Sequence, residues 1–272
     1  MLFVFCGNIQ ADENAKKTAP EKETLSVQEI VEKTNHASYY QGKDGSAKVK
    51  MVITDSQGRE RNREFTILRW DQPAPDGKDG DTYCGNQKFY VYFTRPADVN
   101  KMVFMVWKKT EGDDDRWLYM PALDLVKRIA ASDKRTSFVG SNFFYEDVSG
   151  RSIDADKHEL VETTDNYYVL KNTPKEPGEV EFAYYKMWIH KGSFLPVKTE
   201  YYDKDAKAYR RYTASKVEEI QGFKTVTQSM MQDLSDKSKT VMTYDEVKYN
   251  IGIPEDVFTE RYLRRAPRKY LR

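Results

Sequence analysis

Residues 89–93 read Phe-Tyr-Val-Tyr-Phe, and residues 102–107 read Met-Val-Phe-Met-Val-Trp. Both runs have the length of a strand and consist largely of residues that strands favour. Neither run alternates with polar residues, although a strand with one face in water normally does so. Residues 117–120 (WLYM) and 182–189 (FAYYKMWI) have the same character. The sequence therefore predicts an antiparallel sheet in which several strands are covered on both faces.

Two arrangements explain strands that are apolar on both faces. In the first, a helix packs on one face, and tightly packed side chains fill the other without leaving a cavity. In the second, the sheet is strongly curved, and its concave face forms an apolar pocket with helices as a lid. The pattern alone favours the first arrangement and leaves the second open.

Short turns separate many further strand-like segments, which indicates an antiparallel meander without regular intervening helices. A helix is predicted over residues 26–38, because Ser26 and Glu29 have the spacing of a capping box. A short helix is predicted over residues 254–263. The predicted strands span residues 46–55, 59–70, 88–95, 100–109, 115–120, 123–130, 157–163, 166–172, 179–190, 196–203, 207–218, 222–232 and 237–249.

The two ends of the chain differ from its middle. Residues 2–9 are mostly apolar and residues 10–24 are polar, so residues 1–24 are interpreted as a truncated export leader with a disordered linker. If this leader is removed, the second cysteine, Cys84, has no partner for a disulfide. A single domain is expected over residues 25–263.

Residues 264–272 form a basic tail without an acidic residue. Its cations include Arg264, Arg265, Arg268 and Lys269. One interpretation is a contact with an anionic membrane surface or an acidic partner. The other is a solvated chain terminus.

Composition and motifs exclude several classes of function. The chain has 272 residues, with 44 Lys and Arg against 43 Asp and Glu. This balance gives no reason to expect nucleic acid as a partner, and no apolar run reaches the length of about 20 residues that a membrane-spanning helix needs. The three histidines lack metal-ligand spacing, and no nucleophile, base and oxyanion site can be assembled. We therefore expect a binding protein without a metal or cofactor, not an enzyme.

A series of motifs resembles the outer-membrane lipoprotein-sorting protein family, a branch of the LolA-like lipoprotein carriers. The series begins with residues 95–99 (RPADV) and continues with residues 116–123 (RWLYMPAL), Arg128-Ile129 and residues 137–147 (SFVGSNFFYED). Residues 194–198 (FLPVK) and 253–258 (IPEDVF) also fit. One departure is Asn100-Lys101, which stands where the family usually has a glycine.

The resemblance implies an unclosed antiparallel half-barrel with helices against its concave face. It also implies a periplasmic location and an apolar cavity that holds the acyl chains of a lipid or lipoprotein. Members are often partnered with membrane transporters of the resistance-nodulation-division (RND) type. The alternative function is therefore a non-enzymatic accessory or sensor protein that docks on such a transporter.

Candidate cavity residues follow from this fold and from the alternation of side chains along each strand. The helix at residues 26–38 and the segment from Ser141 to Val148 are expected to form the lid, with Phe143 and Phe144 as plugs of the empty site. Arg128 is interpreted as a latch of the closed form or, alternatively, as a residue of the outer rim. The predicted cavity side chains are Phe89, Val91, Phe93, Phe104, Val106, Leu118, Met120, Tyr185, Met187 and Ile189.

Overall fold

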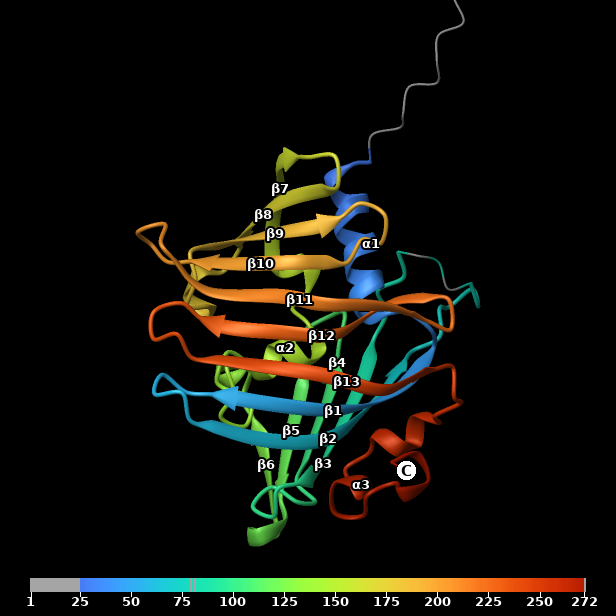
Figure 1. Cartoon of the computed structure of the whole chain (residues 1–272). Coiled ribbons are helices and arrows are strands. Elements are labelled where there is room, and N and C mark those ends of the chain that lie inside the picture. Colours follow the sequence, from blue (N-terminus) through green and yellow to red (C-terminus); the bar gives the residue numbers. More distant parts are fainter. Residues whose placement is uncertain (1–24, 79, 81, 272) are drawn as a thin grey trace, which may run out of the picture.

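A computed structural model describes residues 25–78, 80 and 82–271 of the chain. Within them, thirteen strands form one antiparallel sheet that does not close into a barrel, and the helices are few and short (Figure 1). The predicted mainly-β, half-barrel class is thereby confirmed. The leader predicted over residues 1–24 lies outside the described residues.

The elements follow one another with short turns. The strands are β1 (Asp44–Thr54), β2 (Glu60–Asp71), β3 (Gln87–Arg95), β4 (Val103–Lys108), β5 (Asp115–Met120), β6 (Leu125–Ile129), β7 (Asp156–Thr163), β8 (Tyr167–Pro174), β9 (Tyr184–His190), β10 (Pro196–Tyr202), β11 (Ala208–Ile220), β12 (Phe223–Asp233) and β13 (Lys239–Tyr249). The α-helices are α1 (Val27–Tyr39), α2 (Tyr145–Ser149) and α3 (Arg261–Arg264). The 3-10 turns are η1 (Pro121–Leu123), η2 (Ala131–Asp133), η3 (Ile153–Ala155), η4 (Pro177–Glu179), η5 (Glu255–Phe258) and η6 (Arg268–Tyr270).

The order of the strands explains why one long connection crosses the sheet. The chain runs from β1 outward to β6, then starts again at β7 on the opposite edge and returns to β13, which pairs with β1. Residues 130–155 must therefore span the distance between the two edges. They carry α2 across the concave face, where Phe138 and Phe143 are buried against the sheet.

The two apolar faces of β3 and β4 are covered by different parts of the chain. Phe89 and Val91 belong to a cluster on the concave face that also includes Phe138 of the connection. On the opposite face, Tyr90 packs with Phe258 from the C-terminal segment, residues 251–271. The Tyr90 hydroxyl also donates to the Tyr262 carbonyl at 2.8 Å. These strands therefore do not alternate with polar residues, because the connection covers their concave face and the C-terminal segment covers the opposite face.

The helix predicted at residues 26–38 is present as α1, and its capping box forms. The Ser26 hydroxyl accepts from the Glu29 amide at 3.2 Å, and the Glu29 carboxylate accepts from the Ser26 amide at 2.7 Å. Ile30 and Val31 then bury one face of the helix. They pack against Leu170 and Ile189, together with other residues of β8 and β9.

Three predicted boundaries were wrong for local reasons. The strand predicted from residue 179 begins only at Tyr184, because Pro177–Glu179 forms a 3-10 turn. The strand predicted from residue 100 begins at Val103, because Lys101 has a φ of 66° in the turn before it. This left-handed conformation is the one that glycine adopts most readily, in agreement with the glycine that the resemblance implies here. The helix predicted over residues 254–263 is divided into η5 and α3.

Candidate functional site

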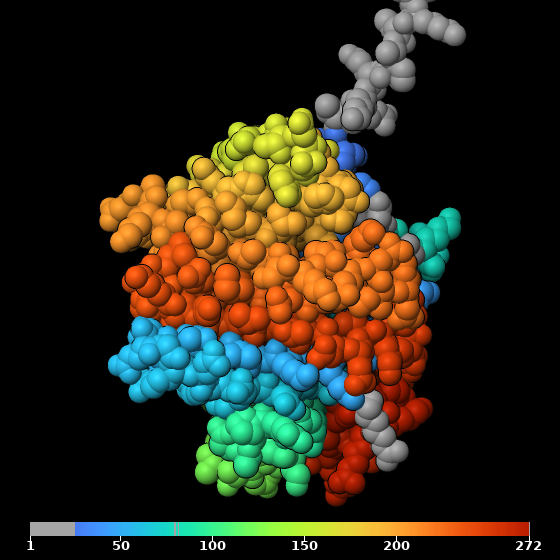
Figure 2. All heavy atoms as spheres, viewed as in Figure 1, coloured from blue at the N-terminus to red at the C-terminus, as the bar shows by residue number. Residues whose placement is uncertain are grey.

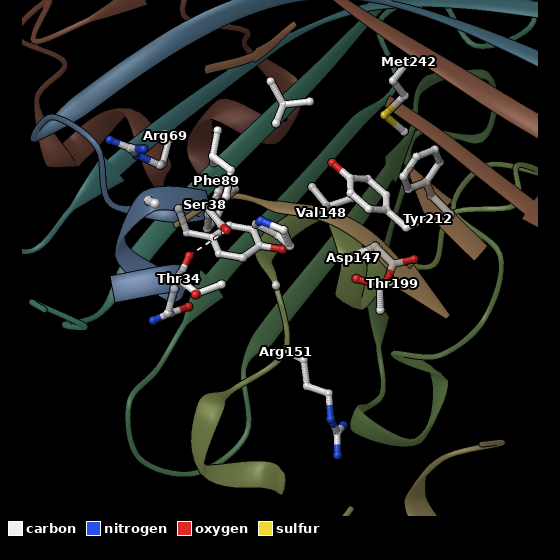
Figure 3. Close-up of a pocket in the computed structure, with 18 of the residues that line it drawn as sticks. Thr34, Ser38, Arg69, Phe89, Asp147, Val148, Arg151, Thr199, Tyr212 and Met242 are labelled. Atoms are coloured by element: carbon white, nitrogen blue, oxygen red, sulfur yellow. Dashed lines mark hydrogen bonds between the residues drawn. The ribbon is translucent and has the colours of Figure 1, made fainter. Parts of the chain in front are cut away.

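A cavity of about 390 Å³ lies between the concave face of the sheet and the elements that cover it. Strands from both halves of the sheet contribute to its wall, and α1 and the end of α2 complete it. Figure 3 shows Thr34 and Ser38 of α1 on one side and Val148, Tyr212 and Met242 on another. The volume falls within the range of about 300–1,000 Å³ that is typical of small-molecule sites.

The wall of the cavity is mainly apolar. Phe89 and Val91 of β3 contribute from one half of the sheet, and Met187 and Ile189 of β9 contribute from the other. Methionines adapt their shape more readily than branched or aromatic side chains. Met187 is joined by Met231 and Met242 in the wall. A surface of this kind accommodates a flexible hydrocarbon chain without requiring one fixed ligand shape.

Five of the ten predicted cavity side chains line this space. They are Phe89, Val91, Tyr185, Met187 and Ile189. The structure therefore brings residues of β3 and β9 together around one cavity, although about a hundred residues separate them in the sequence. Their contact with a ligand stays a prediction.

The other five predicted side chains are not among the residues that line the cavity: Phe93 lies near the end of β3, and the other four lie on β4 and β5. Phe93, Phe104 and Val106 are buried in the concave cluster, and Leu118 is partly buried against it. The connection fills this part of the concave face: the ring of Phe104 lies 5.4 Å from that of Phe138 and 5.1 Å from that of Tyr145, centroid to centroid. Met120 is half-buried at the end of β5.

The two predicted plugs have different surroundings. Phe143 is buried in the concave cluster and lines the cavity. Phe144 lies between two guanidinium groups, with its ring centre 4.8 Å from that of Arg135 and 4.0 Å from that of Arg210. Phe143 is therefore placed where a plug would act, whereas Phe144 contributes to the attachment of α2.

Arg128, the predicted latch, lies on the edge strand β6. Its side chain is 65% exposed, forms an ion pair with Asp115 and lies over the ring of Trp117. Both partners belong to the neighbouring strand β5. These contacts correspond to the rim alternative, and a latch role for Arg128 stays a prediction.

Buried charges hold α2 against the sheet. Arg210 of β11 pairs with Asp147 of α2 and donates to the Asn142 carbonyl at 3.0 Å. Arg135 pairs with Glu146 of α2 at 3.1 Å. The side chains of Arg135 and Arg210 are only 7% and 4% exposed. Because charges buried this deeply are stable only when paired, α2 is fixed in position.

The same network extends to the loop after α2. Arg151 pairs with Asp156 at 2.9 Å and with Glu146 at 3.4 Å. Burial acts to raise the pKa of the Glu181 carboxyl, but the hydrogen bond and charge of Arg135, together with the hydrogen bond from Tyr209, outweigh burial and lower the pKa. Burial and the adjacent Asp156 carboxylate raise the pKa of Tyr185 well above 10, so that this cavity-lining phenol stays neutral.

Sequence reasoning did not identify this network. Glu146 and Asp147 stand in the quoted motif, but their partner Arg210 lies 63 positions beyond Asp147 in a strand of mixed character. Two charged residues next to the aromatic pair Phe143-Phe144 were the available signal. That signal indicates a buried ion pair without naming the partner.

Apolar contacts and a few hydrogen bonds at one end hold α1. The C-terminal end is tied down because Gln87 donates to the Tyr39 carbonyl at 2.7 Å. Gly150 allows the Tyr39 ring to approach closely, because a Cβ at this position would lie 2.5 Å from the ring. Towards its N-terminal end, α1 is seated mainly through Ile30 and Val31. The helix is therefore attached more firmly at its end than at its start.

Among the neutral polar groups of the cavity wall, two buried atoms lack a hydrogen-bond partner within the described residues. They are the Thr34 hydroxyl of α1 and the Asn172 side-chain amide nitrogen of β8. Most charged groups in the wall have partners instead, such as Lys224, which pairs with Glu219 at 2.6 Å. Apart from the exposed Lys248, the charged residues that line the cavity have partners, so a ligand meets mainly apolar and neutral polar groups.

The basic tail lies on the outer face of the sheet. Arg264, Arg265, Arg268 and Lys269 are exposed, while Leu263 is buried among residues of β3 and β4.

Between residues 25 and 271, leaving out positions 79 and 81, no helix has the length and apolar character to cross a membrane. In the same residues, no cluster of three or more His, Cys, Asp or Glu side chains offers a metal site.

Comparison with known proteins identifies a matching protein family and solved structures that are similar to this chain. Residues 85–265, more than half of the chain, match the model of a family described as uncharacterized proteins. The chain belongs to this family. A DUF1329 family protein from Desulfovibrio piger is 28% identical, with a TM-score of 0.76 over 87% of this chain and 97% of its own. None of the curated proteins matches the sequence.

Two further solved structures have the same fold. An outer membrane lipoprotein-sorting protein domain from Vibrio parahaemolyticus is 24% identical, with a TM-score of 0.76 over 88% of this chain and 98% of its own. A LolA superfamily protein from Nitrosomonas europaea is 20% identical, with a TM-score of 0.65 over 88% of this chain and all of its own. The LolA-like half-barrel predicted from the motifs is confirmed.

Proposed function

We propose that this protein is a carrier or acceptor that binds the acyl chains of a lipid or lipoprotein in the cavity beneath α1. The observation that carries this proposal is the apolar cavity of about 390 Å³ on the concave face. Because the charges of its wall are paired apart from the exposed Lys248, the cavity suits a hydrocarbon chain better than an anionic group. The LolA-like fold supports the same reading.

The energetics allow loading and release. Fully burying a Val or Ile side chain is worth about 1.5–3 kcal/mol, so lifting Ile30 and Val31 out of their seat costs about 3–6 kcal/mol. Each methylene that enters the cavity gains about 0.8 kcal/mol. A chain of roughly eight methylenes therefore offsets the opening of α1, before the loss of ligand freedom is counted. Because the gain from burying such a chain is close to the cost of opening α1, the cargo can be both bound and released.

The test is native mass spectrometry of the protein purified from cells, with a variant that fills the cavity. Val247 lines the cavity from β13, and Val247→Trp places a larger side chain there. Val217→Trp makes the same change at a position that is 41% exposed on β11 and serves as the matched control. We expect the wild type and the control to retain lipid, and Val247→Trp to retain at least tenfold less.

Other outcomes separate the alternatives. Equal lipid in all three proteins would place the ligand elsewhere, provided that circular dichroism shows each variant to be folded. Lipid-free wild-type protein that captures a membrane transporter would instead support the accessory or sensor function on an RND-type transporter.

The proposal includes export to the periplasm, which the resemblance and the apolar start of the sequence support. The test compares osmotic-shock release of the full chain with that of a chain lacking residues 2–24. We expect release of the full chain only. Retention of both in the cytoplasm would overturn this part of the proposal.

A further inference from the structure

The hairpin between β5 and β6 ends in an exposed apolar tip. Pro121–Leu123 forms a 3-10 turn, and Asp124 follows with a φ of 44°. Leu123 is 71% exposed and Leu125 is 46% exposed. Leu123 has the largest exposed fraction among the large aliphatic side chains of residues 25–78, 80 and 82–271. Nothing in the packing of the sheet requires two leucines at this point.

The basic tail is held beside this tip. Arg264 donates from Nε to the Asp124 carboxylate at 2.9 Å and from Nη2 to the Asp124 carbonyl at 3.2 Å. Its guanidinium also lies over the ring of Tyr119. The tail is anchored from below, because Leu263 is buried and the Trp107 indole donates to the Phe258 carbonyl at 2.7 Å. Segments that are 140 positions apart therefore form one surface.

The charge of this surface is mostly positive. Among the described residues of the hairpin and tail, five exposed cations form no ion pair: Lys127, Arg261, Arg265, Arg268 and Lys269. Asp124 is neutralised by Arg264, and Glu255 by Lys88. Asp256 and Glu260 are the exposed acidic residues that remain unpaired here. Cations around exposed leucines are typical of proteins that rest on an anionic bilayer.

The shape of this end favours a bilayer over a folded partner. In Figures 1 and 2 the hairpin and the C-terminal segment occupy the same end of the molecule, opposite the end that carries β7. A turn that presents leucines at its tip can insert between lipid headgroups, while the cations beside it contact phosphates. A protein partner is normally met by a broader surface with aromatic anchors.

We propose that the β5–β6 tip and the basic tail form a docking surface for an anionic phospholipid membrane. Leu123 and Leu125 enter the interface, and the tail cations are attracted by the lipid phosphates. Neither a single apolar turn nor a short basic segment holds a protein at a membrane permanently, so docking is reversible. This surface is independent of the proposed acyl-binding cavity.

Vesicle co-sedimentation of the protein tests this surface. The probes are vesicles of phosphatidylcholine alone and of phosphatidylcholine with about 30% phosphatidylglycerol. We expect binding to the anionic vesicles only, with at least a tenfold loss for Leu123→Asp and for the double variant Arg265→Glu/Arg268→Glu. Raising the salt concentration should weaken binding of the wild type, because it screens the charges.

Matched controls carry the same changes at other sites. Val161→Asp alters another exposed aliphatic residue, on β7, and Lys204→Glu/Lys237→Glu reverses two exposed lysines in other turns. The controls and Val247→Trp should bind the vesicles as the wild type does. The Val247→Trp result separates docking from cavity loading.

Three outcomes would overturn the proposal. They are no binding of the wild type, equal binding to neutral vesicles, and equal losses in the control variants. The surface would be assigned to a protein partner instead if two results came together. The wild type would not bind vesicles, and the Leu123 and Arg265/Arg268 variants would no longer capture a membrane protein that the wild type captures.

Discussion

The two helices that cover the cavity, α1 and α2, are held by different forces. Buried ion pairs attach α2 to β11 and to the loops around it. Apolar contacts of Ile30 and Val31 seat α1, with a polar attachment at Tyr39. Apolar contacts weaken gradually as a helix tilts. Separating a buried ion pair, in contrast, leaves an unpaired charge in the interior, which costs its full desolvation penalty. We therefore expect α1 to open about its C-terminal end more readily than α2 leaves the sheet.

The largest expected effect comes from the α2 attachment. Arg210→Ala leaves the Asp147 carboxylate buried with its next cation, Arg135, at 3.9 Å. Breaking a buried pair in this way typically costs about 3–5 kcal/mol, so we expect the free energy of unfolding in urea to fall by about 3 kcal/mol.

The matched control is Arg128→Leu, which removes an arginine that is 65% exposed. Exposed pairs contribute about 0–1 kcal/mol, so we expect a change in unfolding free energy of less than about 1 kcal/mol and unchanged lipid uptake and release. Equal destabilisation by Arg210→Ala and Arg128→Leu would contradict the conclusion that the buried ion pair of Arg210 holds α2. Altered uptake kinetics in Arg128→Leu alone would make Arg128 the latch after all.

Local signals in the sequence were sufficient for the strands and the first helix, whereas the half-barrel was expected from the family resemblance and not from the strand pattern. Turn residues and strand-forming runs place thirteen strands to within a few residues, and the Ser26–Glu29 spacing fixes the start of α1. Alternation also places Phe89 and Val91 on one face of β3 and Tyr90 on the other. These features depend on neighbours along the chain, which a single sequence displays.

The sequence was not sufficient for the site, because the site depends on contacts between distant segments. Alternation gives Phe89 and Phe104 the same face, but only the path of residues 130–155 decides that Phe104 is packed and Phe89 lines the cavity. The pairing of Asp147 with Arg210 likewise requires α2 to cross the concave face. No local pattern specifies where a connection of this length runs.

A second prediction concerns the seat of α1 and its response to pH. Asp71 accepts from Gln87 at 2.8 Å, and the same Gln87 amide holds the Tyr39 carbonyl. Burial raises the pKa of Asp71 to about 7 from 3.8, against the opposing effects of Arg69 and Gln87. Between these two values the folded protein keeps a proton that the unfolded chain has lost. Stability from this group is therefore present at low pH and is lost as pH rises through 7.

We expect the wild type to lose on the order of 2 kcal/mol of unfolding free energy between pH 5 and pH 7, relative to Asp71→Asn. The measurement is urea denaturation of both proteins across this range. The Asp71→Asn variant is the control for the wild type, because it keeps a polar side chain of the same size that does not titrate. Parallel profiles for the two proteins would show that Asp71 is ionised in the folded state throughout this range.

The smallest effect sharpens the comparison at the other end of α1. Ser26→Ala removes the cap that accepts from the Glu29 amide, which typically costs about 1 kcal/mol. If α1 opens from its N-terminal end, we expect amide exchange within residues 27–39 to accelerate about fivefold, while residues 145–149 keep their protection. Ser132→Ala, at an exposed position in η2, is the matched control. Equal acceleration in both helices would mean that α1 and α2 open as one unit, and that the buried charges do not hold α2 separately.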